Sequence, residues 1–175
     1  VRARSTGTSA ADVDRALTVD RSLLVTWVNR GTLHLIRSED YPFLQALTAP
    51  RLATGNARRL AQEGVDAGAA ERGVAVIAAA LGDAGPLTRE QLRARLDSAG
   101  VPTAGQALVH LLALASMRGL IVRGPMAGAQ QAFVLVHDWI GEPAPVTVSP
   151  GAAPAASRIN LFTMRWCVPS PFGKI

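Results

Sequence analysis

The sequence contains few of the residues on which covalent or metal-centred chemistry depends. It has a single cysteine, Cys167, and three widely separated histidines, His34, His110 and His137. One cysteine cannot form an internal disulfide, and histidines this far apart lack the spacing of zinc ligands on a helix. We therefore expect no metal site and no cofactor.

Long apolar runs are also missing. No stretch reaches the ~18 to 20 apolar residues of a membrane-spanning helix, and no signal peptide opens the chain, which predicts a cytoplasmic protein without a membrane partner. The chain begins with Val1 rather than Met, and we expect it to be part of a longer protein. Its 175 residues are 49% hydrophobic and 18% charged, which excludes a wholly disordered tail.

Acidic residues are fewer than basic ones. Eighteen Lys and Arg against thirteen Asp and Glu give a net charge of +5, which suggests a polyanionic partner such as nucleic acid. Lys174 is the only lysine, so the Arg-rich composition is also consistent with genome bias, and a small surplus is common in soluble proteins. Both interpretations remain open.

Residues 1–52 have the pattern of a helix followed by a β-hairpin. Ser9 supplies a capping hydroxyl for a short helix with acidic residues in its first turn. Two β-rich runs, 23–28 and 32–36, flank Asn29-Arg30-Gly31, which accommodates the positive backbone angles of a tight turn. This order matches the second half of a winged helix.

A further helix and a linker are expected next. Residues 38–40 precede a helix over 41–47, and Pro50 is expected to end it because proline lacks the backbone N–H. Residues 53–69 are predicted to form a polar linker.

Residues 70–140 show the pattern of a complete winged helix. Apolar residues at helical spacing predict a first helix, and capping-box spacing at Thr88 and again at Thr103 predicts the second and third. Strand-like runs at 120–123 and 132–136 follow. The expected fold is mainly α with small β-hairpins, a tandem winged helix whose first unit is truncated and whose second is complete.

The composition changes in residues 141–175. Residues 141–157 are rich in Pro, Ala, Ser and Gly, as in flexible linkers, and the remainder has aromatic residues but no periodic apolar face. We expect a flexible linker and a poorly ordered tail.

Three separated blocks resemble one family of bacterial winged-helix proteins. They are Thr26-Trp27-Val28-Asn29-Arg30-Gly31-Thr32-Leu33-His34-Leu35, Gly85-Pro86-Leu87-Thr88, and Gly119-Leu120-Ile121-Val122-Arg123-Gly124-Pro125 leading to His137-Asp138-Trp139-Ile140. They stand in the order of the AlkZ-like DNA glycosylase family, and the resemblance covers roughly residues 1–140.

The resemblance implies a role in DNA repair, with double-stranded DNA, damaged or intact, as the partner. Members of the family excise bulky alkylated bases or unhook interstrand crosslinks. Their catalysis depends on a Gln-x-Gln or Gln-x-Asp motif upstream of the segment where this chain begins, and Gln130-Gln131 is only an adjacent pair. We therefore expect no catalytic residue here and no excision by this chain alone. A non-catalytic winged-helix scaffold and a transcription regulator are the alternatives.

Seven residues are candidates for DNA contact. They are Arg30, Thr32, His34, Arg89, Gln106, His110 and Arg123. Arginine makes charge-assisted contacts with phosphate, threonine is a neutral donor, and glutamine can pair with adenine. The hairpin turn is the first choice, with Thr32 and His34 on one strand face.

Each candidate also has a purely structural explanation. His34 can pack against a helix, and Gln106 and His110 can face a sister unit rather than a groove. Arg89 can join a surface ion-pair lattice, and Arg123 lies at the root of a wing whose tip has no basic residue. The aromatic residues can stack on an extruded base, but aromatics spaced like these usually form core. They are Trp27, Trp139, Tyr41 and Phe43.

Overall fold

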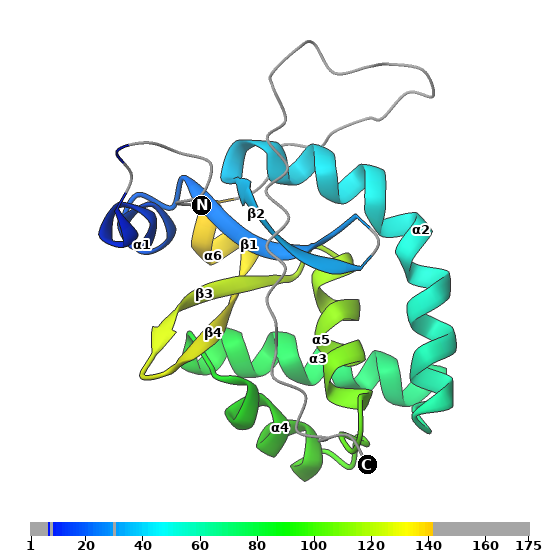
Figure 1. Cartoon of the computed structure of the whole chain (residues 1–175). Helices are drawn as coiled ribbons and strands as arrows, with labels where there is room; N and C mark the ends of the chain where they lie inside the picture. Colours follow the sequence, from blue (N-terminus) through cyan, green and yellow to red (C-terminus); the bar gives the residue numbers. More distant parts are fainter. Residues whose placement is uncertain (1–6, 8, 30, 142–175) are drawn as a thin grey trace, which may run out of the picture.

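The computed structural model describes residues 7, 9–29 and 31–141 (Figure 1). Its elements in chain order are α1 (Ala10–Thr18), β1 (Leu23–Val28), β2 (Thr32–Arg37), a 3-10 turn η1 (Ser38–Asp40), α2 (Tyr41–Gln62), α3 (Ala67–Ala84), α4 (Arg89–Ser98), α5 (Ala107–Met117), β3 (Ile121–Ala127), β4 (Gln130–Leu135) and α6 (Val136–Ile140). The mainly helical fold with two β-hairpins is confirmed. The predicted linker and tail lie outside the described residues from position 142 onward.

Both predicted hairpins belong to one antiparallel sheet. The strand order is β2-β1-β3-β4, so the two hairpins meet where β1 pairs with β3, with Val25 opposite Arg123. At the turn between β1 and β2, Asn29 and Gly31 adopt positive φ angles, as expected of a tight reversal. Segments assigned to two modules from the sequence thus share a hydrogen-bonded sheet.

The two faces of this sheet have different neighbours. Residues paired across antiparallel strands lie on the same face. One face carries Leu24, Val28 and Ile36, which form a core cluster with Tyr41 and Leu44 of α2. The opposite face has a second cluster, in which Ile121, Phe133 and Leu135 pack with the following residues of α3 to α5. They include Val74, Ile77, Leu81, Leu92, Leu96, Leu108 and Leu111.

Helix α5 is the most enclosed helix of the described fold. None of its residues is exposed, and it contacts α2, α3 and β1. A helix that is apolar on every side is a core helix. It therefore presents only partly exposed side chains, those of Val109, His110 and Leu114.

Helix α2 continues past Pro50, so the expected end at this residue is wrong. The helix runs to Gln62 with Pro50 in its interior, and Figure 1 shows it bending along its length, which a proline inside a helix explains. Buried Leu44 before the proline and buried Asn56 and Leu60 after it hold both halves against the fold. Packing thus outweighs the lost backbone hydrogen bond.

The expected linker over 53–69 is consequently mostly helical. Residues 53–62 belong to α2, and α3 begins at Ala67, so only four residues separate the two helices. Asp66 caps α3 by accepting a hydrogen bond from the backbone N–H of Ala69 at 2.7 Å. Most polar residues in the stretch 53–62 lie on exposed helix surface, and Asn56 is buried.

Two of the expected caps are confirmed. Ser9 and Thr88 form capping boxes with Asp12 and Gln91. Thr103 does not cap α5, because its hydroxyl bonds the carboxylate of Asp97 at 2.5 Å. Two ends of the second hairpin also differ from expectation. The third strand extends into the expected loop as far as Ala127, and Val136, expected in a strand, begins α6.

Candidate nucleic-acid interface

The β1–β2 turn supplies three of the candidate residues. Arg30 lies outside the described residues. The hydroxyl of Thr32, which is exposed, and Nε2 of His34 are 2.8 Å apart. His34 is buried on the sheet face that carries Leu24 and Ile36. Its imidazole therefore contributes to packing beneath the hairpin, and Thr32 is the part of this pair that solvent reaches.

Gln106 is the residue just before α5 and His110 lies in the first half of this helix, both close to the C-terminal half of α2. The Gln106 side chain is exposed, and its backbone N–H donates to the carboxylate of Glu63 at 2.9 Å. Nδ1 of His110 lies 3.1 Å from Oδ1 of Asn56, whose amide donates to the His110 carbonyl. This interlock directs His110 toward α2 rather than outward.

The surroundings of His110 lower its pKa. Burial has the largest effect, because it disfavours the charged imidazolium. The carboxylate of Glu63 opposes the shift, and the guanidinium of Arg59 adds to it. A neutral imidazole in the folded state makes no ionic contact with phosphate.

Arg123 lies on the opposite sheet face, among aromatic rings. Its guanidinium carbon is 4.3 Å from the Phe133 ring centroid and 5.4 Å from that of Trp27. The two rings are nearly parallel, at 7°, with centroids 6.2 Å apart. Burial, followed by the charge of neighbouring Arg89, lowers the pKa of Arg123 to about 10. The group remains a cation at neutral pH.

Arg89 is therefore a neighbour of Arg123 although 33 residues lie between them in the sequence. Arg89 is the first residue of α4, and Leu87 just before it exchanges two backbone hydrogen bonds with Phe133 of β4. The structure brings these two candidates together, whereas Thr32 and His34 belong to another edge of the sheet, and Gln106 and His110 to α5. Local sequence patterns carry no signal for this proximity, which depends on the bridge between Leu87 and Phe133.

Trp27 is a neighbour that the sequence analysis did not connect with Arg123. It is half-buried on β1 and packs against the cluster that contains Phe133. Trp27 therefore both packs in the core and makes a cation–π contact with the guanidinium of Arg123.

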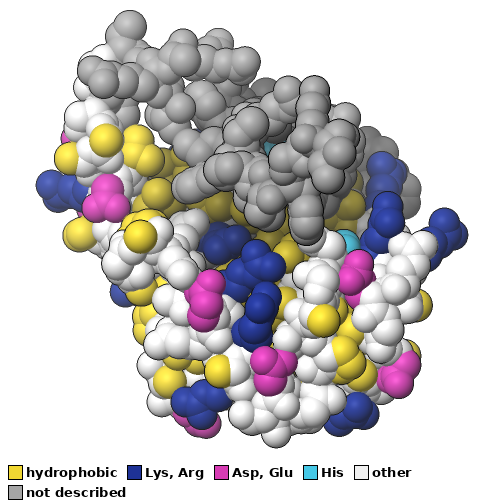
Figure 2. Space-filling model, turned by 60° about the horizontal axis from the view of Figure 1, so that its bottom comes forward, with side chains coloured by type: hydrophobic (Ala, Val, Ile, Leu, Met, Phe, Trp, Pro, Cys, Tyr) yellow, Lys and Arg dark blue, Asp and Glu magenta, His cyan; other side chains and the backbone are white. Residues whose placement is uncertain are grey.

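The positive charge of the chain is unevenly distributed. The described residues contain twelve Arg and twelve Asp or Glu, so their charges balance. The other six basic residues and Glu142 lie outside the described residues. The basic residues are Arg2, Arg4, Arg30, Arg158, Arg165 and Lys174. Any electropositive site within the described fold must therefore come from local clustering, and Figure 2 shows Lys and Arg side chains gathered near the middle of one face.

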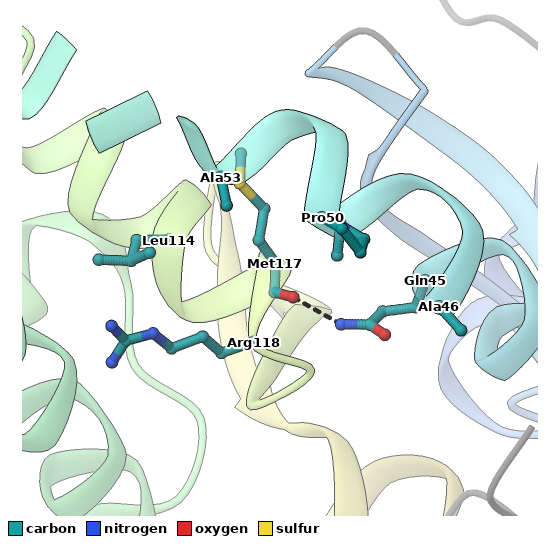
Figure 3. Close-up of a pocket in the computed structure, with 8 residues that line it drawn as sticks. Gln45, Ala46, Pro50, Ala53, Leu114, Met117 and Arg118 are labelled. Carbon is teal, nitrogen blue, oxygen red and sulfur yellow. Dashed lines mark hydrogen bonds between the residues drawn. The ribbon is translucent and has the colours of Figure 1, made fainter. Parts of the chain in front are cut away.

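An open hollow of about 360 Å³ lies between α2 and the end of α5 (Figure 3). Its lining residues are Gln45, Ala46, Ala49, Pro50, Ala53, Leu114, Met117 and Arg118. The amide of Gln45 donates to the Met117 carbonyl at 2.6 Å, and Arg118 forms a two-pronged ion pair with Glu71. With its polar groups already bonded, this hollow carries no evident chemistry.

The described part of the chain holds no group of three or more His, Cys, Asp or Glu side chains positioned to bind a metal ion. Its helices also lack the combined length and apolar character of a membrane span. The candidate chemistry is therefore that of arginine side chains and aromatic rings.

Comparison with known proteins agrees with this picture. The family model described as DNA glycosylase AlkZ-like matches residues 1–165. The solved structure of Streptomyces sahachiroi DNA glycosylase AlkZ matches with a TM-score of 0.66 and 25% sequence identity, over 84% of this chain and 40% of that chain. No curated protein matches the sequence. This chain thus spans about two fifths of the length of the solved relative. Since the family model extends over nearly all of its residues, the chain belongs to the AlkZ-like DNA glycosylase family.

Proposed function

We propose that this protein binds double-stranded, damaged DNA as part of a glycosylase-type repair protein. The match of the family model to residues 1–165 carries the proposal. The fold shared with a solved DNA glycosylase supports it, as do two neighbouring arginines, Arg123 on the sheet and Arg89 at the start of α4. A cytoplasmic location goes with this function.

The proposed architecture is a tandem winged helix, truncated in its first unit. The order of α3, the Leu87 bridge, α4, α5, β3 and β4 supports a complete second unit. The order of α1, β1 and β2 supports a partial first unit. In this arrangement α5 holds the units together instead of entering a groove, because none of its residues is exposed.

The proposed contacts favour the arginines. The residues most favoured for DNA contact are Arg30, Thr32, Arg89 and Arg123. The less favoured candidates are His34, Gln106 and His110, since both histidines are hydrogen-bonded within the fold. The 175 residues contain no pair of the Gln-x-Gln or Gln-x-Asp type. We therefore propose that they contribute DNA binding rather than base excision.

A salt titration of duplex binding tests this function. We expect the chain to bind a short duplex with an affinity that falls linearly with salt on logarithmic axes, and Arg30→Ala to reduce the slope by about 0.9, the value for one lost phosphate contact. Arg15→Ala is the matched control, because Arg15 already pairs with Asp20. Absence of binding at low salt would contradict the proposal and favour a scaffold whose winged helices only pack on each other.

A further inference from the structure

Arg123 and the segment that leads into Arg89 lie on opposite sides of the same sheet residue. Phe133 of β4 pairs with Arg123 of β3 on one side and exchanges backbone hydrogen bonds of 2.8 and 3.2 Å with Leu87 on the other. Arg89 follows Leu87 by two residues at the start of α4. Sheet pairing and the start of α4 thus bring the two arginines near the same residue of β4, and the charge of Arg89 acts on Arg123.

Aromatic rings hold one of these groups in place. The Arg123 guanidinium lies within cation–π distance of both Phe133 and Trp27. The rings cover part of its surface, which limits its hydration and reduces the freedom of its long side chain. An arginine held in this way loses little further entropy when it binds an anion.

Both arginines lack an anionic partner within the described fold. Arg15, Arg37 and Arg118 each pair with a carboxylate there. Arg89 and Arg123 have no ion pair with any described residue, and the Nε atom of each is buried without a hydrogen-bond acceptor. A buried donor left unsatisfied costs about 1 to 3 kcal/mol, more when it is charged, so these positions favour a bound acceptor.

We propose that Arg89 and Arg123 together bind one phosphate group of a nucleic-acid backbone. The inference rests on the proposed DNA-binding function and assigns a specific contact to it. A phosphate offers oxygen acceptors to two planar guanidinium groups at once and offsets the repulsion between them. Inorganic phosphate presents the same oxygens, so the test has to separate a free ion from a backbone phosphate.

The test compares duplex binding by the full chain and its variants across salt. Arg89→Gln, Arg123→Met and the double variant are each expected to lower the slope of log affinity against log salt by about 0.9, since all three lose the same phosphate. Arg95→Gln removes an equal charge from an exposed site in the last turn of α4 and is expected to leave the slope unchanged. An unchanged slope in the double variant, or a loss near 1.8 that indicates two separate phosphates, would overturn the proposal.

Two further measurements distinguish a loss of folding from a loss of phosphate binding. Circular dichroism melting is expected to show folded variants, because methionine at position 123 keeps an unbranched apolar stem against the rings. If the wild-type chain fails to bind duplex, the proposed function fails. In that case the proposed phosphate site is tested separately, by following the side-chain Nε–H resonances of both arginines while inorganic phosphate is added. Shifts at Arg89 and Arg123 would support a phosphate site, and their absence would overturn it.

Discussion

At the scale of single residues, Tyr41 has a buried hydroxyl group with no identified role in the fold or in the candidate site. Its ring is buried in the cluster between α2 and the sheet, and its hydroxyl has no hydrogen-bond partner in the described structure. Burial raises the pKa of this phenol above its usual range. The residue thus contributes apolar packing at a cost in desolvation.

Replacing Tyr41 by phenylalanine should therefore not destabilise the protein. We expect Tyr41→Phe to leave the free energy of unfolding unchanged or raise it by up to about 1 kcal/mol, because the desolvation cost of the hydroxyl is removed while the ring stays. Urea denaturation of the wild type and the variant measures the difference in the free energy of unfolding. A loss of more than about 1 kcal/mol would show that the hydroxyl has a bonded partner in solution.

His110 should make stability depend on pH. Its pKa in the folded state lies below the ordinary 6.5, so protonation favours the unfolded chain. The contribution is fully present above pH 6.5 and is lost as the pH falls toward the folded-state value. We expect His110→Gln to show a smaller fall in unfolding free energy between pH 7.5 and 5. An equal fall in both proteins would contradict the lowered pKa.

At the scale of elements, local signals predicted some helix boundaries and missed others. Ser9 and Thr88 mark helix starts through side-chain hydrogen bonds to nearby backbone, which depend on a few neighbouring residues. Pro50 did not end α2, because contacts with α5, remote in sequence, hold the helix together. Thr103 has the spacing of a cap, but the Asp97 carboxylate takes its hydroxyl. Such competition between partners is invisible in a local pattern.

Two helical glycines test how closely α3 and α5 pack. A Cβ atom at Gly73 of α3 would lie 2.9 Å from Cδ2 of Leu111 and 3.3 Å from Cγ1 of Val101. We expect Gly73→Val to lower the free energy of unfolding by about 1 to 3 kcal/mol through overpacking. At Gly55 of α2 nothing lies within 4 Å, so Gly55→Ala should raise it by about 0.5 to 1 kcal/mol. Thermal unfolding of both variants is the measurement, and similar effects at the two sites would contradict the close packing.

At the scale of the whole molecule, the elements were largely predictable but their assembly was not. Both hairpins were expected from their turn residues, whereas the joining of β1 to β3 depends on the single register pair Val25 and Arg123. The same holds for the candidate site, whose residues could be predicted whereas their arrangement in space could not. Arg89 and Arg123 were both predicted as contacts, but only the sheet places them beside the same residue.

One buried hydrogen bond links the first hairpin to the core helix. The hydroxyls of Thr26 in β1 and Ser116 in α5 are 2.9 Å apart. We expect Thr26→Val to cost about 1 to 3 kcal/mol, because Ser116 is left buried without this partner. Adding Ser116→Ala should restore part of the loss. A double-mutant cycle by urea unfolding measures the coupling, and strictly additive effects would show that the hairpin and α5 are energetically independent.

The most direct test of the account is a map of the DNA-contact surface by nuclear magnetic resonance. Titration of the labelled chain with a short duplex should shift the resonances of Arg123 and Trp27 on one sheet face and of Arg89 at the adjoining start of α4. The resonances of α5 from Leu108 to Met117, which is enclosed, should move little. Shifts concentrated on α5, or no shifts at any described residue at low salt, would contradict the claim that this face of the sheet binds DNA.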